Sequence, residues 1–308
     1  MRLIANPVPW PNGARCAVCF SFDMDGESLM HAAMPEKADA RVAGLSELRY
    51  GPTVGVPRIL EIFRHFGIKQ SFFIPGWCAE RYPAAVEAIL KDGHEIGHHG
   101  YLHEDPNQLG LEDERYWTER GTAALVKATG RRPRGYRAPS FAFSNHSFDI
   151  LIEQGIEYDS SLMADDVPYL LAKGNNRLVE LPCCMALDDW PHYMHSFDFA
   201  GTANQISSPK RAFEVFRSEF DAAWEHGGLW IAVWHPFISG RLPRAIAMAE
   251  LIAEMRERGG VWFAPLEAIH DHVRACIADG RWTPRVEELP YAVSPIPELR
   301  RVRPAAAQ

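Results

Sequence analysis

Short apolar runs alternate with longer amphipathic segments along most of the chain. The runs are a few residues long and rich in Val, Ile, Phe or Trp, which is typical of buried strands. Several of them end in polar or charged residues. They predict strands at Ala17–Phe22, Gln70–Ile74, Glu95–His98, Gly135–Arg137, Leu178–Leu181, Leu229–Trp234 and Val261–Ala264.

The longer segments repeat apolar residues every three or four positions, as helices with one buried face do. Val54–Phe66 is an example, with its apolar residues on one stripe. The same spacing predicts helices at Pro83–Lys91, Leu111–Thr129, His146–Gln154, Pro209–Glu225, Arg244–Arg258 and Leu266–Ala278. Glycines stand where helix C-caps would fall, at Gly67, Gly130, Gly155, Gly227 and Gly259.

Repeated strand–helix order predicts an α/β fold with a parallel sheet and crossover helices. About seven such units fit a distorted, closed or nearly closed (β/α) barrel, and a doubly wound open sheet is the alternative. In either fold the active site lies at the carboxyl ends of the strands. We expect a single catalytic domain over residues 1–280 with an insertion at 29–51. An extended tail at 281–308 would be a disordered end or an arm on a neighbouring subunit, so we expect a homo-oligomer.

Composition narrows the classes of function. The chain has 308 residues, 47% of them hydrophobic and 23% charged, which is ordinary for a globular protein. Its net charge of −8 argues against a nucleic-acid partner held through phosphates. No apolar run is long enough to span a membrane, and no signal peptide is visible, so the cytoplasm is the expected compartment.

The cysteines carry no expected chemistry. Six cysteines in a chain of this length do not form a disulfide framework. Cys16 and Cys19 would point to opposite faces of a strand, with no second pair to complete a zinc site. We expect these two, and the pair Cys183 and Cys184, to be ordinary core residues.

Two aspartates end the first predicted strand, in the sequence FSFDMDGES. Asp23 and Asp25 are two residues apart, so both can face the same side at the strand tip. Two neighbouring carboxylates repel each other and are costly to desolvate. A bound metal ion would offset that cost, although a loop with two solvated acids has the same sequence pattern.

Four histidines lie within ten positions in GHEIGHHGYLHE, which favours a metal site. His94 and His98 match the H-E-x-x-H pattern of zinc proteases, but that pattern needs a continuous helix, which the three glycines oppose. His99 and His103 follow the predicted strand, and one helical turn would bring their rings to the same side. With one aspartate they would form a site of two histidines and one carboxylate.

These motifs occur in a known order. FSFDMDGES, HHGYLHE, YRAPSF and VWHPF resemble the motifs of the polysaccharide deacetylase superfamily, also called the NodB homology domain or carbohydrate esterase family 4. The similarity spans roughly residues 17–264. The spaced aspartates differ from the adjacent pair of the exported polysaccharide enzymes. They are more similar to the cytoplasmic branch, with peptidoglycan deacetylase-like proteins, allantoinase-like proteins and cyclic imide hydrolases, which puts a polymer substrate in doubt.

The resemblance implies a distorted β/α barrel with one divalent metal ion, commonly Zn²⁺. By position, Asp25, His99 and His103 would bind the metal and Asp23 would be the general base. Some allantoinase-like members are metal-independent, and the presence of both histidines here favours the metal-dependent kind. The same residues also accept Co²⁺, Fe²⁺, Ni²⁺ or Mn²⁺. From the residues alone, the roles of the two aspartates remain exchangeable.

Two further residues at strand ends suit catalysis. Arg137 can orient Asp23 through a bidentate pair, and the alternative is a surface arginine. His235 follows an apolar run and can protonate a leaving nitrogen, although a core histidine has the same pattern. Substrate contacts or pocket walls are expected at Glu27, Ser28, Pro139, Asp188, Asp189 and Trp190. One of the two acids Asp188 and Asp189 would tune His235 or face the substrate.

The expected reaction is metal-dependent hydrolysis of a non-peptide amide bond. The substrate would be an N-acetylated amino sugar or a small amide such as a cyclic imide or ureide. The spaced aspartates favour a small, soluble substrate. A non-catalytic metal-binding scaffold on the same fold is the alternative from another class.

Overall fold

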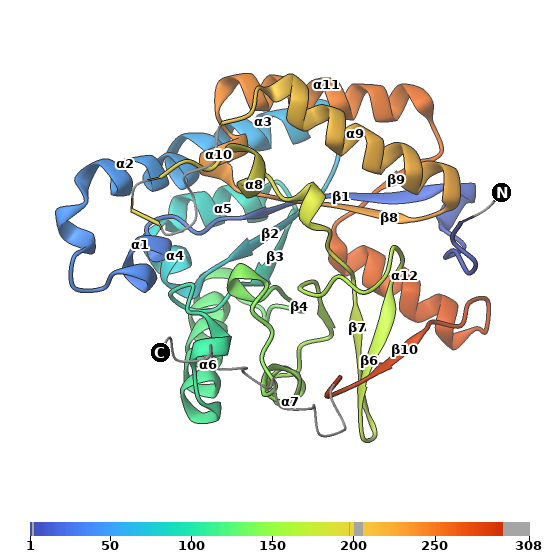
Figure 1. Ribbon diagram of the computed structural model, residues 1–308, viewed down its shortest axis with the longest axis horizontal. Helices are drawn as coiled ribbons and strands as arrows, with labels where there is room; N and C mark the ends of the chain where they lie inside the picture. The colour runs from blue at the N-terminus through green and yellow to red at the C-terminus, as the bar shows by residue number, and fades with distance from the viewer. Residues whose placement is uncertain (2, 197, 200–205, 292–308) are drawn as a thin grey trace, which may run out of the picture.

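Strands from almost the whole length of the chain form one curved sheet (Figure 1). The computed structural model describes residues 1–308 except 2, 197, 200–205 and 292–308. Within these residues the sheet has ten strands, in the order β10-β6-β7-β5-β4-β3-β2-β1-β8, and β9 also pairs with β1. The strands are β1 (Cys16–Asp23), β2 (Ser71–Ile74), β3 (Glu95–His98), β4 (Gly135–Tyr136), β5 (Tyr158–Asp159), β6 (Tyr169–Lys173), β7 (Asn176–Glu180), β8 (Leu229–Trp234), β9 (Val261–Phe263) and β10 (Val286–Glu288).

The predicted fold class, a distorted (β/α) barrel with a mainly parallel sheet, is confirmed. Every strand pair is parallel except β6 and β7, which form an antiparallel hairpin. The pattern missed β5, β6 and β10, of which β5 and β10 have two and three residues. On the far edge of β8, Asp188 forms a parallel bridge with Val233, so the segment after β7 reaches β8.

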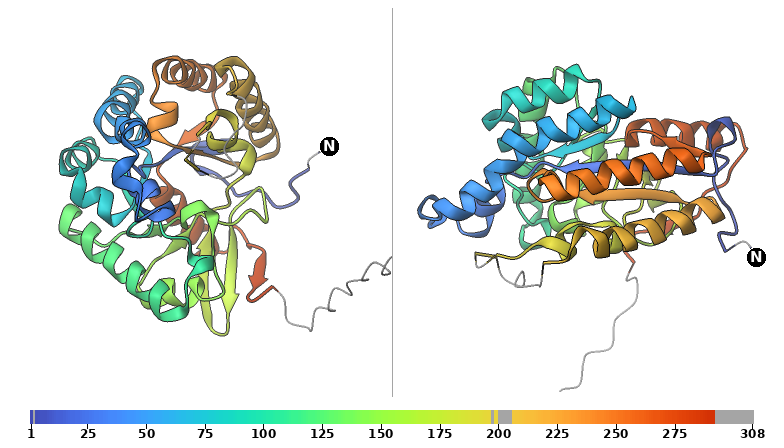
Figure 2. Two further views of the ribbon diagram at one scale, coloured as in Figure 1. Left: turned by 60° about the vertical axis from the view of Figure 1, so that its left-hand side comes forward. Right: turned by 90° about the horizontal axis from the view of Figure 1, so that it is seen from above.

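Helices surround the outside of the sheet (Figure 2). The predicted helices are present with ends within about two residues of those expected, and Gly67, Gly130, Gly155, Gly227 and Gly259 all have the positive φ of C-caps or turns. The α-helices are α1 (Ser28–Ala33), α2 (Val42–Tyr50), α3 (Val56–Phe66), α4 (Gly76–Arg81), α5 (Pro83–Lys91), α6 (Leu111–Thr129), α7 (Ser147–Glu153), α8 (Trp190–Tyr193), α9 (Pro209–His226), α10 (Pro236–Ser239), α11 (Leu242–Arg258) and α12 (Leu266–Ala278).

The two faces of strand β1 have different surroundings. Alternate residues, including Phe20 and Phe22, pack outward against the helices, and each buried aromatic ring contributes roughly 2 kcal/mol. The residues between them face the barrel interior, where Cys19 packs with residues of α12. Asp23, at the C-terminal tip of β1, is on the same face of the strand as Cys19 and lines the cavity described below.

The two regions outside the strand–helix alternation contain regular structure. The insertion at 29–51 contains most of α1 and all of α2, and a π-helical turn (Gly51–Gly55) joins it to α3. In the tail, β10 pairs with β6 of the same chain. Residues 292–308 of the predicted tail lie outside the described residues. None of the described helices combines the length and apolar character that crossing a bilayer requires.

The cysteines are all thiols, and five of the six are buried. Cys16 and Cys19 belong to different core clusters on opposite faces of β1, as expected. Cys184 is exposed, so its predicted place in the core was wrong. It lies just after Cys183, which is buried beside Ser160.

Candidate active site

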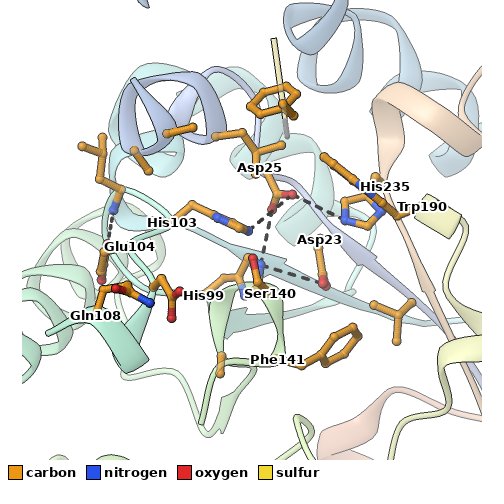
Figure 3. Close-up of a pocket in the computed structure, with 18 of the residues that line it drawn as sticks. Asp23, Asp25, His99, His103, Glu104, Gln108, Ser140, Phe141, Trp190 and His235 are labelled. Atoms are coloured by element: carbon orange, nitrogen blue, oxygen red, sulfur yellow. Dashed lines mark hydrogen bonds and ion pairs between the residues drawn. The ribbon is translucent and has the colours of Figure 1, made fainter. Parts of the chain in front are cut away.

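A cavity of about 840 Å³ lies at the carboxyl ends of the strands (Figure 3). It is lined by the tip of β1, helix α1, the loops after β3 and β4, the segment around α8 and the end of β8. Asp23, Asp25, His99, His103 and His235 all line it. The predicted catalytic and metal-binding side chains are therefore brought together, with Arg137 buried directly behind them.

Asp25 is a buried carboxylate that no hydrogen bond satisfies. Its side chain is fully buried, and neither oxygen has a hydrogen-bond partner among the described residues. Three imidazole Nε2 atoms surround it: His99 at 3.4 Å from Oδ1, and His235 at 3.5 Å and His103 at 3.8 Å from Oδ2. Burial disfavours the charged form, but these imidazoles hold the pKa of Asp25 below its usual range.

The loop from His99 to His103 is not a helical turn, so the predicted local conformation was wrong. His103 has a φ of 59° and Gly100 a φ of 70°, both in the left-handed region. The loop is held by Glu104, whose carboxylate accepts hydrogen bonds from the backbone N–H groups of Tyr101 and Leu102. It nevertheless brings the rings of His99 and His103 to a centroid distance of 5.0 Å.

The two histidines and Asp25 suit a divalent cation. Nδ1 of His99 lies 2.7 Å from the carbonyl oxygen of Arg137, which fixes that nitrogen as the donor and leaves Nε2 for a metal. One ligand atom from each of the three residues lies within 4.8 Å of the others. Tetrahedral ligands about 2.0–2.1 Å from zinc would stand about 3.4 Å apart, close to the spacing of His99 and Asp25.

The charge states agree with a cation at this point. Burial lowers the pKa of His103 to about 4, so its ring is neutral near neutral pH. Burial opposes the charge on His99 as well, but the carboxylates of Asp23 and Asp25 raise its pKa. A divalent cation would replace the proton that these carboxylates otherwise favour on His99.

Arg137 orients Asp23 from inside the barrel. Its guanidinium is fully buried, and Nη1 donates to Oδ1 of Asp23 and to Oγ of Ser21, both at 2.8 Å. Nε and Nη2 donate to the carbonyl oxygen and hydroxyl of Ser160, and Nη2 also lies 3.7 Å from the Cys183 sulfur. The predicted bidentate pair with Asp23 was wrong, since only one nitrogen reaches one oxygen. The alternative of a surface arginine is also excluded.

His235 is held by Asp189 at the tip of β8. Nδ1 lies 2.6 Å from Oδ1 of Asp189, whose Oδ2 accepts from the backbone N–H of His235 and from Ser239 Oγ at 3.0 and 2.5 Å. Burial alone would lower the pKa of His235, but Asp189, with Asp25 and Asp188, raises it to about 10. The ring is therefore protonated near neutral pH, with Nε2 directed toward Asp25 (Figure 3).

Asp188 and Asp189, whose roles the sequence could not distinguish, have different surroundings. Asp189 does not line the cavity and serves His235 from behind. Asp188 lines it, with Oδ1 accepting a 2.7 Å hydrogen bond from the N–H of Trp190. Trp190 lines the cavity too, with its ring 5.4 Å from that of His235.

Three residues expected at the substrate lie behind the cavity wall. Ser28 donates to the carbonyl oxygen of Asp25 at 2.6 Å. Glu27 is buried and accepts a hydrogen bond from the hydroxyl of Tyr82. Pro139 is buried as well, while its neighbours Ala138 and Ser140 line the cavity. Glu27, Ser28 and Pro139 therefore support the wall rather than form its surface.

The other two histidines of the cluster are structural. His98 is buried on β3, with Nε2 3.0 Å from the carbonyl oxygen of Thr118 and Nδ1 accepting from the N–H of Gly100. His94 precedes β3 and accepts from the backbone N–H of Gln70. The segment is a strand, so the zinc-protease interpretation does not apply.

Backbone strain gathers at the cavity. Four non-glycine residues in the described part of the chain have positive φ, and three of them, His103, Ser140 and Phe141, line the cavity. Such conformations cost of order 1–3 kcal/mol each and persist only where the surroundings impose them. Sequence reasoning had no signal for Ser140 and Phe141. The acidic end of HHGYLHE could have indicated the role of Glu104.

Known proteins are similar in sequence and in structure. The polysaccharide deacetylase family model matches residues 49–158. The chain is 30% identical over 253 residues to a peptidoglycan deacetylase from Helicobacter pylori, covering 71% of this chain and 83% of that protein. A Mycobacterium smegmatis crystal structure described as a polysaccharide deacetylase is 44% identical, with a TM-score of 0.85 over 92% of this chain and 98% of that one. An allantoinase crystal structure shares the fold at 24% identity, with a TM-score of 0.76 over 88% and 95% of the two chains. This chain belongs to the polysaccharide deacetylase family.

Proposed function

We propose that this chain is a metal-dependent hydrolase of non-peptide amide bonds. The observation that carries the proposal is Asp25, whose buried oxygens receive no hydrogen bond from the part of the chain that is described and face Nε2 of His99 and of His103. A divalent cation held by these three residues would supply a Lewis acid for the amide carbonyl and for water. Zinc suits two imidazoles and one carboxylate, and Co²⁺, Fe²⁺, Ni²⁺ and Mn²⁺ are also compatible.

Two residues of the chain would move the protons. Asp23 has one oxygen held by Arg137, and its other oxygen lies 3.8 Å from Nε2 of His99, beside the cation site. We assign it as the general base that takes a proton from the attacking water. His235, protonated and braced by Asp189, would give its Nε2 proton to the departing nitrogen.

The cavity walls support a small substrate. Leu29, Ala32 and Ala33 of the 29–51 segment line one side. Trp190 and Phe199 line the cavity from the segment that follows β7. We therefore favour an N-acetyl group on a small amino sugar or a small cyclic amide such as an imide or ureide over an extended polymer.

The test is removal and return of the cation. The protein is dialysed against a chelator and then given Zn²⁺, Co²⁺ or Mn²⁺, while hydrolysis of chitooligosaccharides, N-acetylglucosamine and succinimide is followed. We expect at least one amide to be hydrolysed only with cation present. Asp25→Asn should lose both bound zinc and turnover, while the distant surface substitution Asp149→Asn should keep them. Zinc binding without hydrolysis of any of these amides would favour a non-catalytic metal-binding scaffold.

A further inference from the structure

Acids outnumber basic groups on the cavity wall, and the described basic residues of the lining are the three histidines of the candidate site. Six acids line it, namely Asp23, Asp25, Glu104, Asp105, Asp188 and Asp198. Among the residues described there is no lysine or arginine in the lining. A substrate carboxylate is normally recognised by an arginine fork or a lysine, and this wall offers neither.

Most of these acids already have partners. Arg137 pairs with Asp23, and Arg41 lies 3.4 Å from Asp198. The Glu104 carboxylate accepts two backbone N–H groups of its own loop, and Asp105 accepts the N–H of Asn107. These contacts hold Asp198, Glu104 and Asp105 to the protein's own structure, and they hold one oxygen of Asp23.

Asp188 differs from them. It is only 5% exposed, yet it lines the cavity. Oδ1 accepts the Trp190 N–H, and the described part of the chain provides no hydrogen bond to Oδ2. The cationic group beside Asp188 is His235, whose Nδ1 is 4.0 Å from Oδ1 of Asp188 and already bonds to Asp189. Burial raises the pKa of Asp188 to about 7, so above that pH the carboxylate is ionised and its Oδ2 can accept a hydrogen bond from a ligand in the cavity.

We infer that Asp188 selects the substrate, by accepting an N–H or ammonium group next to the scissile amide and by repelling carboxylates. This inference rests on the proposed function and names its substrate class: neutral or cationic N-acyl amines, such as an amino sugar or an acylated diamine. Amides with a carboxylate near the scissile bond should bind more weakly. Two like charges a few ångströms apart in a partly dehydrated cavity differ from an opposite pair by about tenfold or more in affinity.

Three linear acetamides of similar length test the inference by calorimetry on the zinc-loaded protein at about pH 8.5, where Asp188 is ionised: N-acetylputrescine, N-butylacetamide and 4-acetamidobutyrate. The cationic amide should bind about tenfold or more tightly than the anionic one, with the neutral amide between. Asp188→Asn keeps an oxygen for the Trp190 N–H, and it should shrink the ratio to about threefold or less. Asp149→Asn, on the surface in α7 and paired with Lys173, makes the same change in net charge and should leave the ratio unchanged.

The binding order separates this inference from the proposed function, because it needs no turnover. If 4-acetamidobutyrate binds as tightly as N-acetylputrescine, or if Asp188→Asn leaves the ratio unchanged, Asp188 does not select by charge. Failure of all three acetamides to bind would also overturn the inference, and hydrolysis of another amide would still support the proposed function. If the three acetamides bind in the expected order but no amide is hydrolysed, the inference about Asp188 holds and the proposed hydrolase function does not.

Discussion

The pair between Arg137 and Asp23 allows a quantitative test of how the site is built. Both side chains are buried, with exposed fractions of 0% and 5%, and Nη1 of Arg137 donates to Oδ1 of Asp23 at 2.8 Å. Replacing Arg137 with Met leaves the Asp23 carboxylate in the interior without its counter-ion. Breaking a buried pair in this way typically costs about 3–5 kcal/mol.

The double variant separates the pair from its parts. Asp23→Asn alone leaves the guanidinium without its charged partner, although Ser21 and both polar atoms of Ser160 still accept from it. With both substitutions no unpaired charge remains, so the loss should be smaller than the sum of the single losses. We expect a coupling energy of about 2 kcal/mol.

Urea unfolding, followed by circular dichroism in the presence of a chelator, measures these free energies without a contribution from bound metal. The control is Arg217→Met, which breaks the surface pair with Glu254 and should cost far less because water screens it. If the two single losses add to within about 0.5 kcal/mol, the pair is not coupled. The claim that Arg137 holds Asp23 for proton transfer would then lose its physical basis.

Three further predictions concern residues that the sequence could not separate. His99→Ala should abolish zinc binding, whereas His98→Ala should keep zinc and lose about 1–3 kcal/mol of stability, because the groups that His98 bonds are left unpaired. Mass spectrometry measures the zinc content and urea unfolding the stability. Loss of zinc in His98→Ala but not in His99→Ala would show that the assignment is wrong. Asp189→Asn should lower kcat by about 10² without loss of zinc, because His235 no longer has the carboxylate that holds its proton, and an unchanged kcat would contradict this role. Burial, with the nearby Glu267 carboxylate, raises the pKa of Glu95 from 4.5 to about 7, so the folded protein keeps a proton that the unfolded chain releases. Wild type should therefore lose up to about 3 kcal/mol relative to Glu95→Gln as the pH rises from 4.5 to 7, and a difference independent of pH in urea unfolding would refute it.

The helices were predictable because their signals are local. Leu111–Thr129 was predicted to the residue from its apolar spacing and from Gly130, which takes a φ of 76° at the C-cap. Strands β5 and β10 are too short to show alternation. The hairpin of β6 and β7 did leave a signal, since Gly174 starts a tight turn between two apolar runs, with a φ of 57°.

The site was predictable where it depends on strand ends. The order of the strands brings the tips of β1, β3 and β8 to one edge, and this placed Asp25, His99 and His235 together without any knowledge of the loops. What the sequence could not decide was which of Asp188 and Asp189 faces the cavity. That choice depends on the bridge between residue 188 and β8, a contact between segments far apart in the chain.

The two aspartates at the tip of β1 have surroundings that separate their roles. Asp23 receives the Nη1 hydrogen of an arginine that is held by four further contacts, to Ser21, to both polar atoms of Ser160 and to Cys183. Asp25 receives no hydrogen bond from the described residues and lies among imidazole Nε2 atoms. Exchanging the roles would require a cation to compete with a fixed guanidinium at Asp23 and would leave Asp25 unsatisfied. The proposed assignment of Asp25 as ligand and Asp23 as base is therefore supported by the arginine partner that the protein already gives to Asp23.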